Sequence, residues 1–178
     1  MPDPTQSQFS AADATLGYLY QVRSALLWSL RRLKTDQGFL VSVETLDDVT
    51  FETSGGKATD LLQMKHHRQA TASLTNASPD LWKTLRVWFE GHTSGDIPPN
   101  ANLYLVTTGL ASDESAASRL RATGRDVEIA RQALDATASS SSNQTNKSAY
   151  DAYLKASPTE RTSILTGRFQ ERCRIFQF

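Results

Sequence analysis

Apolar residues recur at helical spacing near the start of the chain. Between residues 11 and 33 they occupy Leu16, Leu19, Tyr20, Leu26, Leu27, Leu30 and Leu33. This spacing predicts one amphipathic helix over the stretch. Gly38 follows it, and glycine is favoured where a helix ends because it accepts the left-handed conformation. The polar, proline-containing residues 1–10 are interpreted as a flexible leader.

Three short segments of alternating apolar and polar residues come next, at 39–45, 48–53 and 60–67. Alternate side chains of a strand point to opposite faces, so this pattern predicts three strands that each bury one face. A Ser-Gly-Gly-Lys turn at 54–57 separates the last two strands, and its glycines suit a tight connection. The three strands are therefore expected to form an antiparallel meander.

The second half of the chain contains further helices and strands. Ser78 and Pro79 mark a helix start, because serine caps a helix and proline suits its first turn. The continuous apolar run at 102–108 predicts a buried strand. Helices are expected from 112 onward, interrupted by a serine-rich segment at 139–148 that we interpret as a mobile loop. A helix at 158–170 and a short strand at 174–178 complete the chain.

The order of these elements predicts the fold class. A helix, a three-strand meander, a crossover helix and one more strand give an α/β domain with a mixed sheet and helices on its faces. Additional helices follow on the C-terminal side. The chain has 178 residues, which suffices for one domain with a proper core, placed at 11–178.

Composition narrows the classes of partner. The chain has 19 Lys and Arg and 19 Asp and Glu, a net charge of zero, which argues against coating nucleic acid through a broad basic field. The charges are unevenly distributed, however, since all charged residues of 21–34 are basic and all charged residues of 36–53 are acidic. The single cysteine excludes an intrachain disulfide and a cysteine metal cluster. Without a secretory signal or an apolar membrane span, a cytoplasmic location is expected.

Candidate chemistry is concentrated at residues 43–67. Phosphodiester hydrolysis needs oxygen ligands for a hard divalent cation and a positive group beside the attacking water. Gln63 and Lys65 lie two residues apart on a predicted strand and therefore share one face. Antiparallel pairing through the Gly-Gly turn returns Asp48 to their side. An acid, an amide oxygen and an ammonium group are thus expected at one point.

Four sequence blocks carry a resemblance to a known family: GYLYQ at 17–21, VETLDDV at 43–49, LLQMKHH at 61–67 and LWKTLRVW at 81–88. Together they resemble the PD-(D/E)xK nuclease superfamily, in particular the double-stranded DNA endonuclease effector domain of bacterial anti-phage defence proteins. The resemblance implies a restriction-endonuclease-like fold with Asp48 and Gln63 as metal ligands and Lys65 as the catalytic lysine. It also implies Mg²⁺ or Mn²⁺ as cofactor and double-stranded DNA as substrate, cleaved with low sequence specificity.

The resemblance assigns supporting roles as well. Gln21 matches a first-helix position where related enzymes often carry glutamate, and the Met64 backbone carbonyl joins the ligand set. Glutamine at 21 and 63 removes negative charge, which leaves Glu44 and Asp47 as alternative metal ligands.

Basic side chains near this point are candidates for contacts with phosphates. His67 shares the predicted strand face of Lys65. Lys83 and Arg86 lie three residues apart on one face of the predicted helix that begins at Pro79. A solvated helix face accounts for these last two equally well.

Two other functions stay open at this stage. The same fold with a degraded site would serve as an assembly or nucleic-acid-tethering module, which the two glutamines favour, and the scaffold would also suit an RNase. One site breaks one strand, so a double-strand cut predicts a homo-oligomer. The resemblance further implies a fused C-terminal sensor or ATPase domain, so the chain is expected to be the N-terminal part of a longer protein. No membrane partner is expected.

Overall fold

The computed structural model describes residues 11–65, 73–166 and 173–177. Its main element is a five-stranded sheet with the strand order β1-β2-β3-β5-β7. The strands are β1 (Phe39–Val43), β2 (Val49–Thr53), β3 (Ala58–Lys65), β5 (Asn102–Thr107) and β7 (Cys173–Gln177). The first three form an antiparallel meander, while β5 pairs in parallel with both β3 and β7. The predicted α/β class with a mixed sheet is confirmed.

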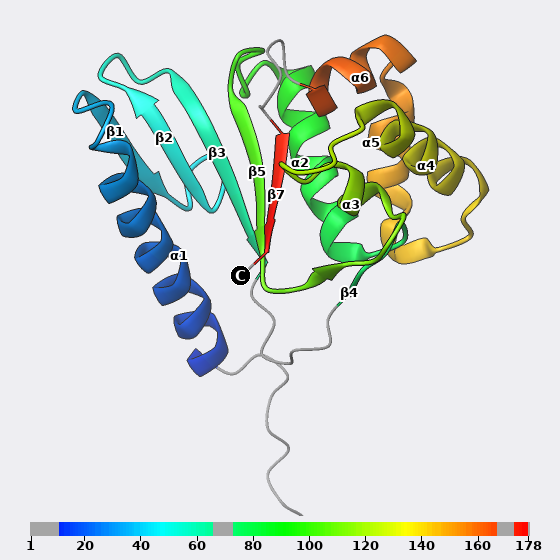
Figure 1. Cartoon of the computed structure of the whole chain (residues 1–178), viewed down its shortest axis with the longest axis horizontal. Coiled ribbons are helices and arrows are strands. Elements are labelled where there is room, and N and C mark those ends of the chain that lie inside the picture. The colour runs from blue at the N-terminus through cyan, green and yellow to red at the C-terminus, as the bar shows by residue number, and fades with distance from the viewer. Residues whose placement is uncertain (1–10, 66–72, 167–172, 178) are drawn as a thin grey trace, which may run out of the picture.

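Helices cover the two faces of the sheet unequally. Helix α1 (Ala11–Arg32) lies on one face, and α2 (Pro79–Ser94) lies on the other with α3 (Ala116–Arg119), α4 (Val127–Ser140), α5 (Lys147–Lys155) and α6 (Pro158–Thr166) (Figure 1). Leu62 and Met64 of β3 pack toward α1, together with Ala25. Leu61 belongs to the larger core formed with α2, α4 and α5. The alternation of β3 therefore separates two cores, as strand geometry requires.

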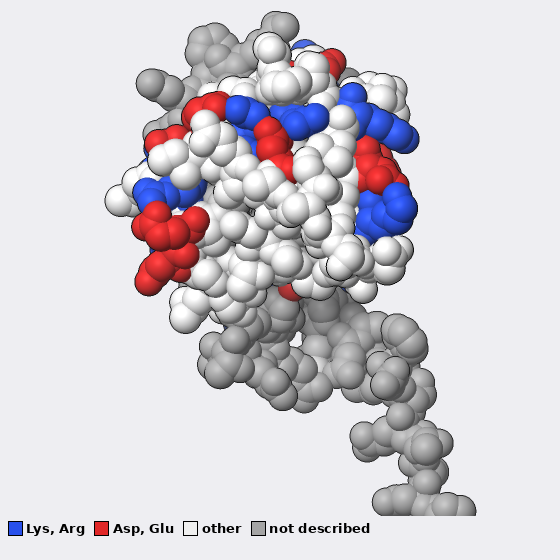
Figure 2. All heavy atoms as spheres, turned by 90° about the vertical axis from the view of Figure 1, so that its right-hand side faces the viewer, with Lys and Arg blue, Asp and Glu red and all other residues white. Residues whose placement is uncertain are grey.

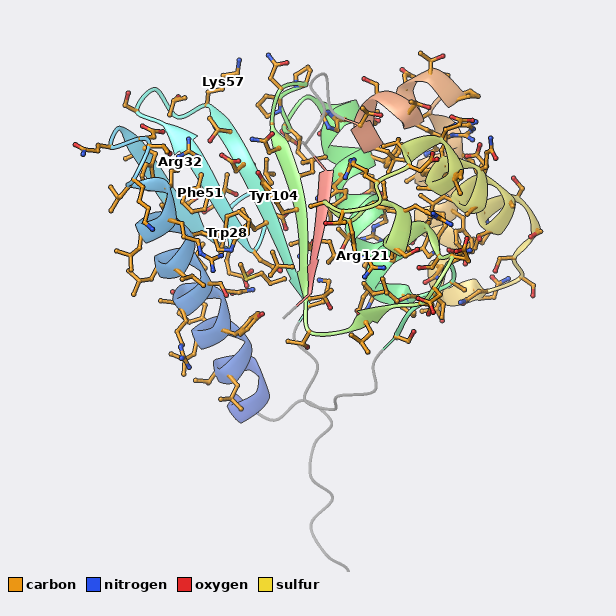
Figure 3. All side chains as sticks on the ribbon, in the orientation of Figure 1. Trp28, Arg32, Phe51, Lys57, Tyr104 and Arg121 are labelled. Carbon is orange, nitrogen blue, oxygen red and sulfur yellow. The ribbon has the colours of Figure 1, made fainter. Side chains whose placement is uncertain are left out.

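A polar cluster fastens the C-terminal end of α1 to the sheet. The Arg32 guanidinium forms an ion pair with Asp60 of β3 and lies 5.2 Å and 5.5 Å from the ring centroids of Phe39 and Phe51. Asn102 of β5 donates a hydrogen bond of 2.8 Å to the same Asp60 carboxylate. Figure 3 shows Arg32 and Phe51 between the helix and the strands. The partly buried charge is thus both paired and hydrogen-bonded, which a charge needs when it leaves water.

Helix α2 is the crossover that makes β5 parallel to β3. Pro79 opens it, and Gly95 ends it with a φ of 84° in the left-handed region. Gly91 has a different purpose, because a Cβ atom there would lie 2.6 Å from the Ile97 side chain. Trp82, Leu85 and Trp88 are almost fully buried, so α2 supplies much of the core on its side of the sheet.

The structure differs from the sequence-based prediction in several places. Strand β3 begins at Ala58, and the two-stranded sheet of β4 (Ser73–Leu74) and β6 (Leu110–Ala111) was not predicted. The segment 139–148 is not one loop: α4 continues to Ser140, and a 3-10 turn, η1 (Gln144–Asn146), leads into α5. The leader 1–10 and residues 167–170 of the last predicted helix lie outside the described residues.

None of the described helices combines the length and the apolar character needed to cross a bilayer.

Candidate functional site

The pairing of β2 with β3 brings Asp48 to Gln63. Val49 is opposite Leu62, so Asp48, one residue earlier, lies beside Gln63. The Gln63 side-chain amide donates a hydrogen bond of 2.7 Å to Asp48 Oδ2, and the Met64 backbone N–H donates one of 2.5 Å to the same oxygen. One carboxylate oxygen of Asp48 is therefore held by two donors from β3.

Asp47 is a buried acidic residue next to this contact. The residue is 8% exposed, and its Oδ1 accepts a hydrogen bond of 2.9 Å from the Asp48 backbone N–H. Its Oδ2 is buried without a hydrogen-bond partner among the described residues. Burial raises the pKa of Asp47 to about 7, the neighbouring Asp48 charge adds to the rise, and the Asp48 N–H, Lys65 and Trp88 oppose it. Asp47 is thus a buried carboxyl group that forms no ion pair with the described residues.

A pocket of about 260 Å³ lies next to Gln63 and Lys65 on the α2 side of the sheet. Besides these two, its lining residues are Lys83, Arg86 and Val87 of α2, together with Thr145, Asn146, Ser148 and Ala149 around the start of α5. Arg86 donates a hydrogen bond of 3.1 Å to Ser148 Oγ, which ties the two walls together. Within the described ranges, the ammonium groups of Lys65 and Lys83 form no ion pair. The pocket is therefore suited to an anion.

The side chains around Gln63 include oxygen atoms of the type that a hard divalent cation requires. Asp47 and Asp48 supply carboxylates and Gln63 supplies a carbonyl oxygen, and Mg²⁺ and Mn²⁺ prefer such ligands. Asp47 Oδ2 is buried and has no hydrogen-bond partner among the described residues, so a bound cation would offset the free energy lost when this oxygen leaves water. The set is small, since the described part of the chain contains no group of three or more His, Cys, Asp or Glu able to hold a metal. Among the described side chains, two carboxylates and one amide oxygen are the metal ligands that the site offers.

Among the residues assigned from the sequence, Gln21 and Glu44 are not part of the pocket lining or of the Asp48–Gln63 contact, and a third lies outside the described residues. Gln21 lies on α1, which packs on the Leu62 and Met64 face, whereas Gln63 and Lys65 point to the opposite face. Glu44 has an exposed side chain in the turn between β1 and β2, where it adopts a φ of 59°. His67 lies outside the described residues.

Some residues of the site were missed or undervalued by sequence reasoning. The Asp47–Asp48 pair was visible, but only the structure shows that the Asp47 side chain is the buried one. The wall formed by Asn146 and Ser148 comes from the segment that was expected to be a loop. Its polar composition carried no signal of a contact with β3 and α2.

Comparisons with known proteins give no relative for this chain. No family model, curated protein or solved structure matches it.

Proposed function

We propose that this chain is a metal-dependent endonuclease that hydrolyses phosphodiester bonds of double-stranded DNA. The observation that carries the proposal is the hydrogen bond between Asp48 and Gln63. Gln63 precedes Lys65 by two residues on the same strand face, and both line a pocket that also contains Lys83 and Arg86. This arrangement supports the resemblance to PD-(D/E)xK nucleases, in which an acid and a short strand motif ending in lysine act together. The same resemblance suggests a role as an effector in anti-phage defence.

The basic side chains around the pocket suit a phosphodiester. Lys65, Lys83 and Arg86 approach it from β3 and α2, so a phosphate there would meet positive charge from two elements. On the face formed by the C-terminal helices, in contrast, basic and acidic side chains are interspersed (Figure 2). Binding would depend on a few local phosphate contacts, which gives a shallow salt dependence.

The roles of the individual residues follow from their positions. Asp47, Asp48 and the Gln63 carbonyl oxygen would hold Mg²⁺ or Mn²⁺, with the Met64 backbone carbonyl as a further ligand. The cation, when bound, supplies Lewis acidity at the scissile phosphate. The Lys65 ammonium borders the pocket, where it orients the attacking water and offsets negative charge on the phosphate. The hydrogen bonds from β3 fix Asp48 in place before substrate arrives.

Lys65→Ala tests this function. We expect the variant to remain folded by circular dichroism and to lose at least about a hundredfold in cleavage of supercoiled plasmid with Mg²⁺ or Mn²⁺, because a positioned charge contributes that much to catalysis. Lys57→Ala is the matched control, since Lys57 is exposed in the turn between β2 and β3, away from the pocket (Figure 3). A folded Lys65→Ala variant that cuts at the wild-type rate contradicts the proposal.

A second candidate function is supported by the Asp48–Gln63 hydrogen bond itself. In this bond the Gln63 amide donates to the acid, and the described residues supply two carboxylates to the site, as expected of a nuclease-fold module with a degraded centre. Such a module would tether nucleic acid without cutting it. Titration with Mg²⁺ and Mn²⁺ on duplex DNA, single-stranded DNA and RNA separates the possibilities. Binding without cleavage of any substrate identifies the module, and cleavage of RNA alone identifies an RNase.

A further inference from the structure

The side of α1 that faces away from the sheet carries a row of exposed leucines. Each of them is between 45% and 61% exposed: Leu16, Leu19, Leu26, Leu30 and Leu33, here called the leucine row. Leu33 continues the last turn of the helix, because its N–H donates a hydrogen bond of 2.9 Å to Ser29 O. No described element covers this side of α1 (Figure 1). Monomeric proteins rarely expose an apolar patch of this extent, so the row indicates an interaction surface.

The spacing of the leucine row is that of a coiled coil. With Arg23 included, the positions 16, 19, 23, 26, 30 and 33 are separated alternately by three and four residues, which is the a/d pattern of a heptad repeat. Val22 and Leu27, 39% and 41% exposed, flank the row. The packing of α1 on the sheet uses different residues, among them the buried Ala25. The domain's own core therefore does not require this pattern.

We propose that a second copy of this chain covers the leucine row, with the two α1 helices packed antiparallel. In the register that centres the contact between residues 24 and 25, Leu16 lies opposite the partner's Leu33. Leu19 then lies opposite the partner's Leu30, and Arg23 opposite the partner's Leu26. Four of the five leucines of the row therefore meet a leucine of the other copy, and Leu26 lies along the partner's Arg23.

The arginine selects this direction over the parallel one. A parallel pair would place Arg23 against the partner's Arg23 inside an apolar seam, where two like charges cost free energy. It would also set Arg31 and Lys34 beside their counterparts in the other copy. The antiparallel pair separates these basic ends, and the Arg23 stem packs along a leucine while its guanidinium reaches water.

The test is the oligomeric state of the full chain. Light scattering coupled to gel filtration should give twice the chain mass of 19.6 kDa for the wild type. It should give the single mass for the double variant Leu26→Lys/Leu30→Lys, which is expected to fold because both side chains are exposed. Leu110→Lys is the control, since Leu110 is 61% exposed in β6, away from α1. This variant should remain dimeric. A monomeric wild type, or a double variant that stays dimeric, overturns the proposal.

Disulfide formation tests the register in a Cys173→Ser background. Leu16→Cys/Leu33→Cys should give a covalent dimer on oxidation, while Leu16→Cys alone should not. Cross-linking by the single variant instead would show a parallel pair and overturn the antiparallel assignment.

Binding to vesicles with anionic headgroups tests the remaining alternative. If the wild type is monomeric and binds the vesicles, and Leu26→Lys/Leu30→Lys does not bind them, the leucine row is a membrane-contacting surface and the dimer proposal is wrong. Neither measurement depends on nuclease activity.

Discussion

Asp47 and Asp48 are adjacent and identical in type, but their side chains have opposite environments. Asp48 accepts hydrogen bonds from the Gln63 side chain and the Met64 backbone, so its charge is stabilised. Asp47 has one buried oxygen with no hydrogen-bond partner in the described part of the chain, and burial raises its pKa to about 7. The two side chains point from the same loop toward β3 and α2. Which of them is the buried one depends on tertiary packing, so the sequence identified the pair but not the difference.

Asp47→Asn is expected to stabilise the protein in the absence of divalent cations. Above pH 7 the folded state must keep a buried carboxylate charge, so the substitution should raise the free energy of unfolding at pH 8 by about 1 kcal/mol. The folded pKa lies above the unfolded one, so this gain should disappear as the pH falls below about 4, where the wild-type carboxyl is neutral in both states. Urea unfolding with EDTA at both pH values measures it.

Asp48→Asn provides the contrast to that prediction. The substitution weakens two hydrogen bonds to a charged acceptor, so it should lower the free energy of unfolding by about 1 to 2 kcal/mol under the same conditions. Equal destabilisation by both substitutions would contradict the inference that burial disfavours the charge of Asp47 and not that of Asp48.

At the level of elements, the hydrophobic pattern predicted the meander, α1, α2 and the buried strand β5. It also predicted that Gln63 and Lys65 share a face, because side-chain alternation is a local property of a strand. The start of α5 was missed for the opposite reason. Asn146 is 2% exposed and donates a hydrogen bond of 2.9 Å to Ala77 O, far away in the sequence. A serine- and asparagine-rich segment gives no local sign of such a contact.

Asn146→Ala should therefore be costly. It removes the hydrogen bond to Ala77 O and the contact with the Tyr150 hydroxyl, and should lower the free energy of unfolding by about 2 kcal/mol. Because Asn146 lines the pocket, the variant should also bind duplex DNA more weakly. Gln144→Ala, at an exposed position of the same turn, is the control and should change neither quantity. Equal effects of the two substitutions in urea unfolding and in DNA binding would show that the turn is not anchored by Asn146.

At the scale of the whole molecule, the sheet separates the two surfaces proposed to act. The leucine row lies on the α1 side, and the pocket with Lys65 lies on the α2 side. A dimer formed through α1 consequently directs its two candidate sites away from each other. Such a pair does not place both sites on one step of a duplex, although a double-strand cut needs two sites of opposite polarity.

Plasmid cleavage is accordingly expected to proceed by separate nicks. Supercoiled DNA should convert to the open circular form first, and linear DNA should appear only after the open circle has accumulated. Gel electrophoresis over a time course measures the order. Leu26→Lys/Leu30→Lys should show the same order at an equal rate per chain, since neither side chain lies in the pocket. Linear product that forms without an open circular intermediate would contradict the outward arrangement of the sites.

The position of β3 in the middle of the sheet has a consequence for how the site adapts to its ligand. The pairing of β3 with β2 extends to Leu62, and its pairing with β5 continues through Gln63 and Lys65. The amides of Gln63 and Lys65 should therefore exchange with solvent deuterium only on extensive opening, whereas Lys83 and Arg86 are long exposed side chains on a helix surface. The site therefore combines a rigid part on β3 with an adjustable part, the side chains of Lys83 and Arg86 on α2. Ligand shape is accommodated by rotamers on α2, while the spacing of Asp48, Gln63 and Lys65 is set by the backbone and does not change.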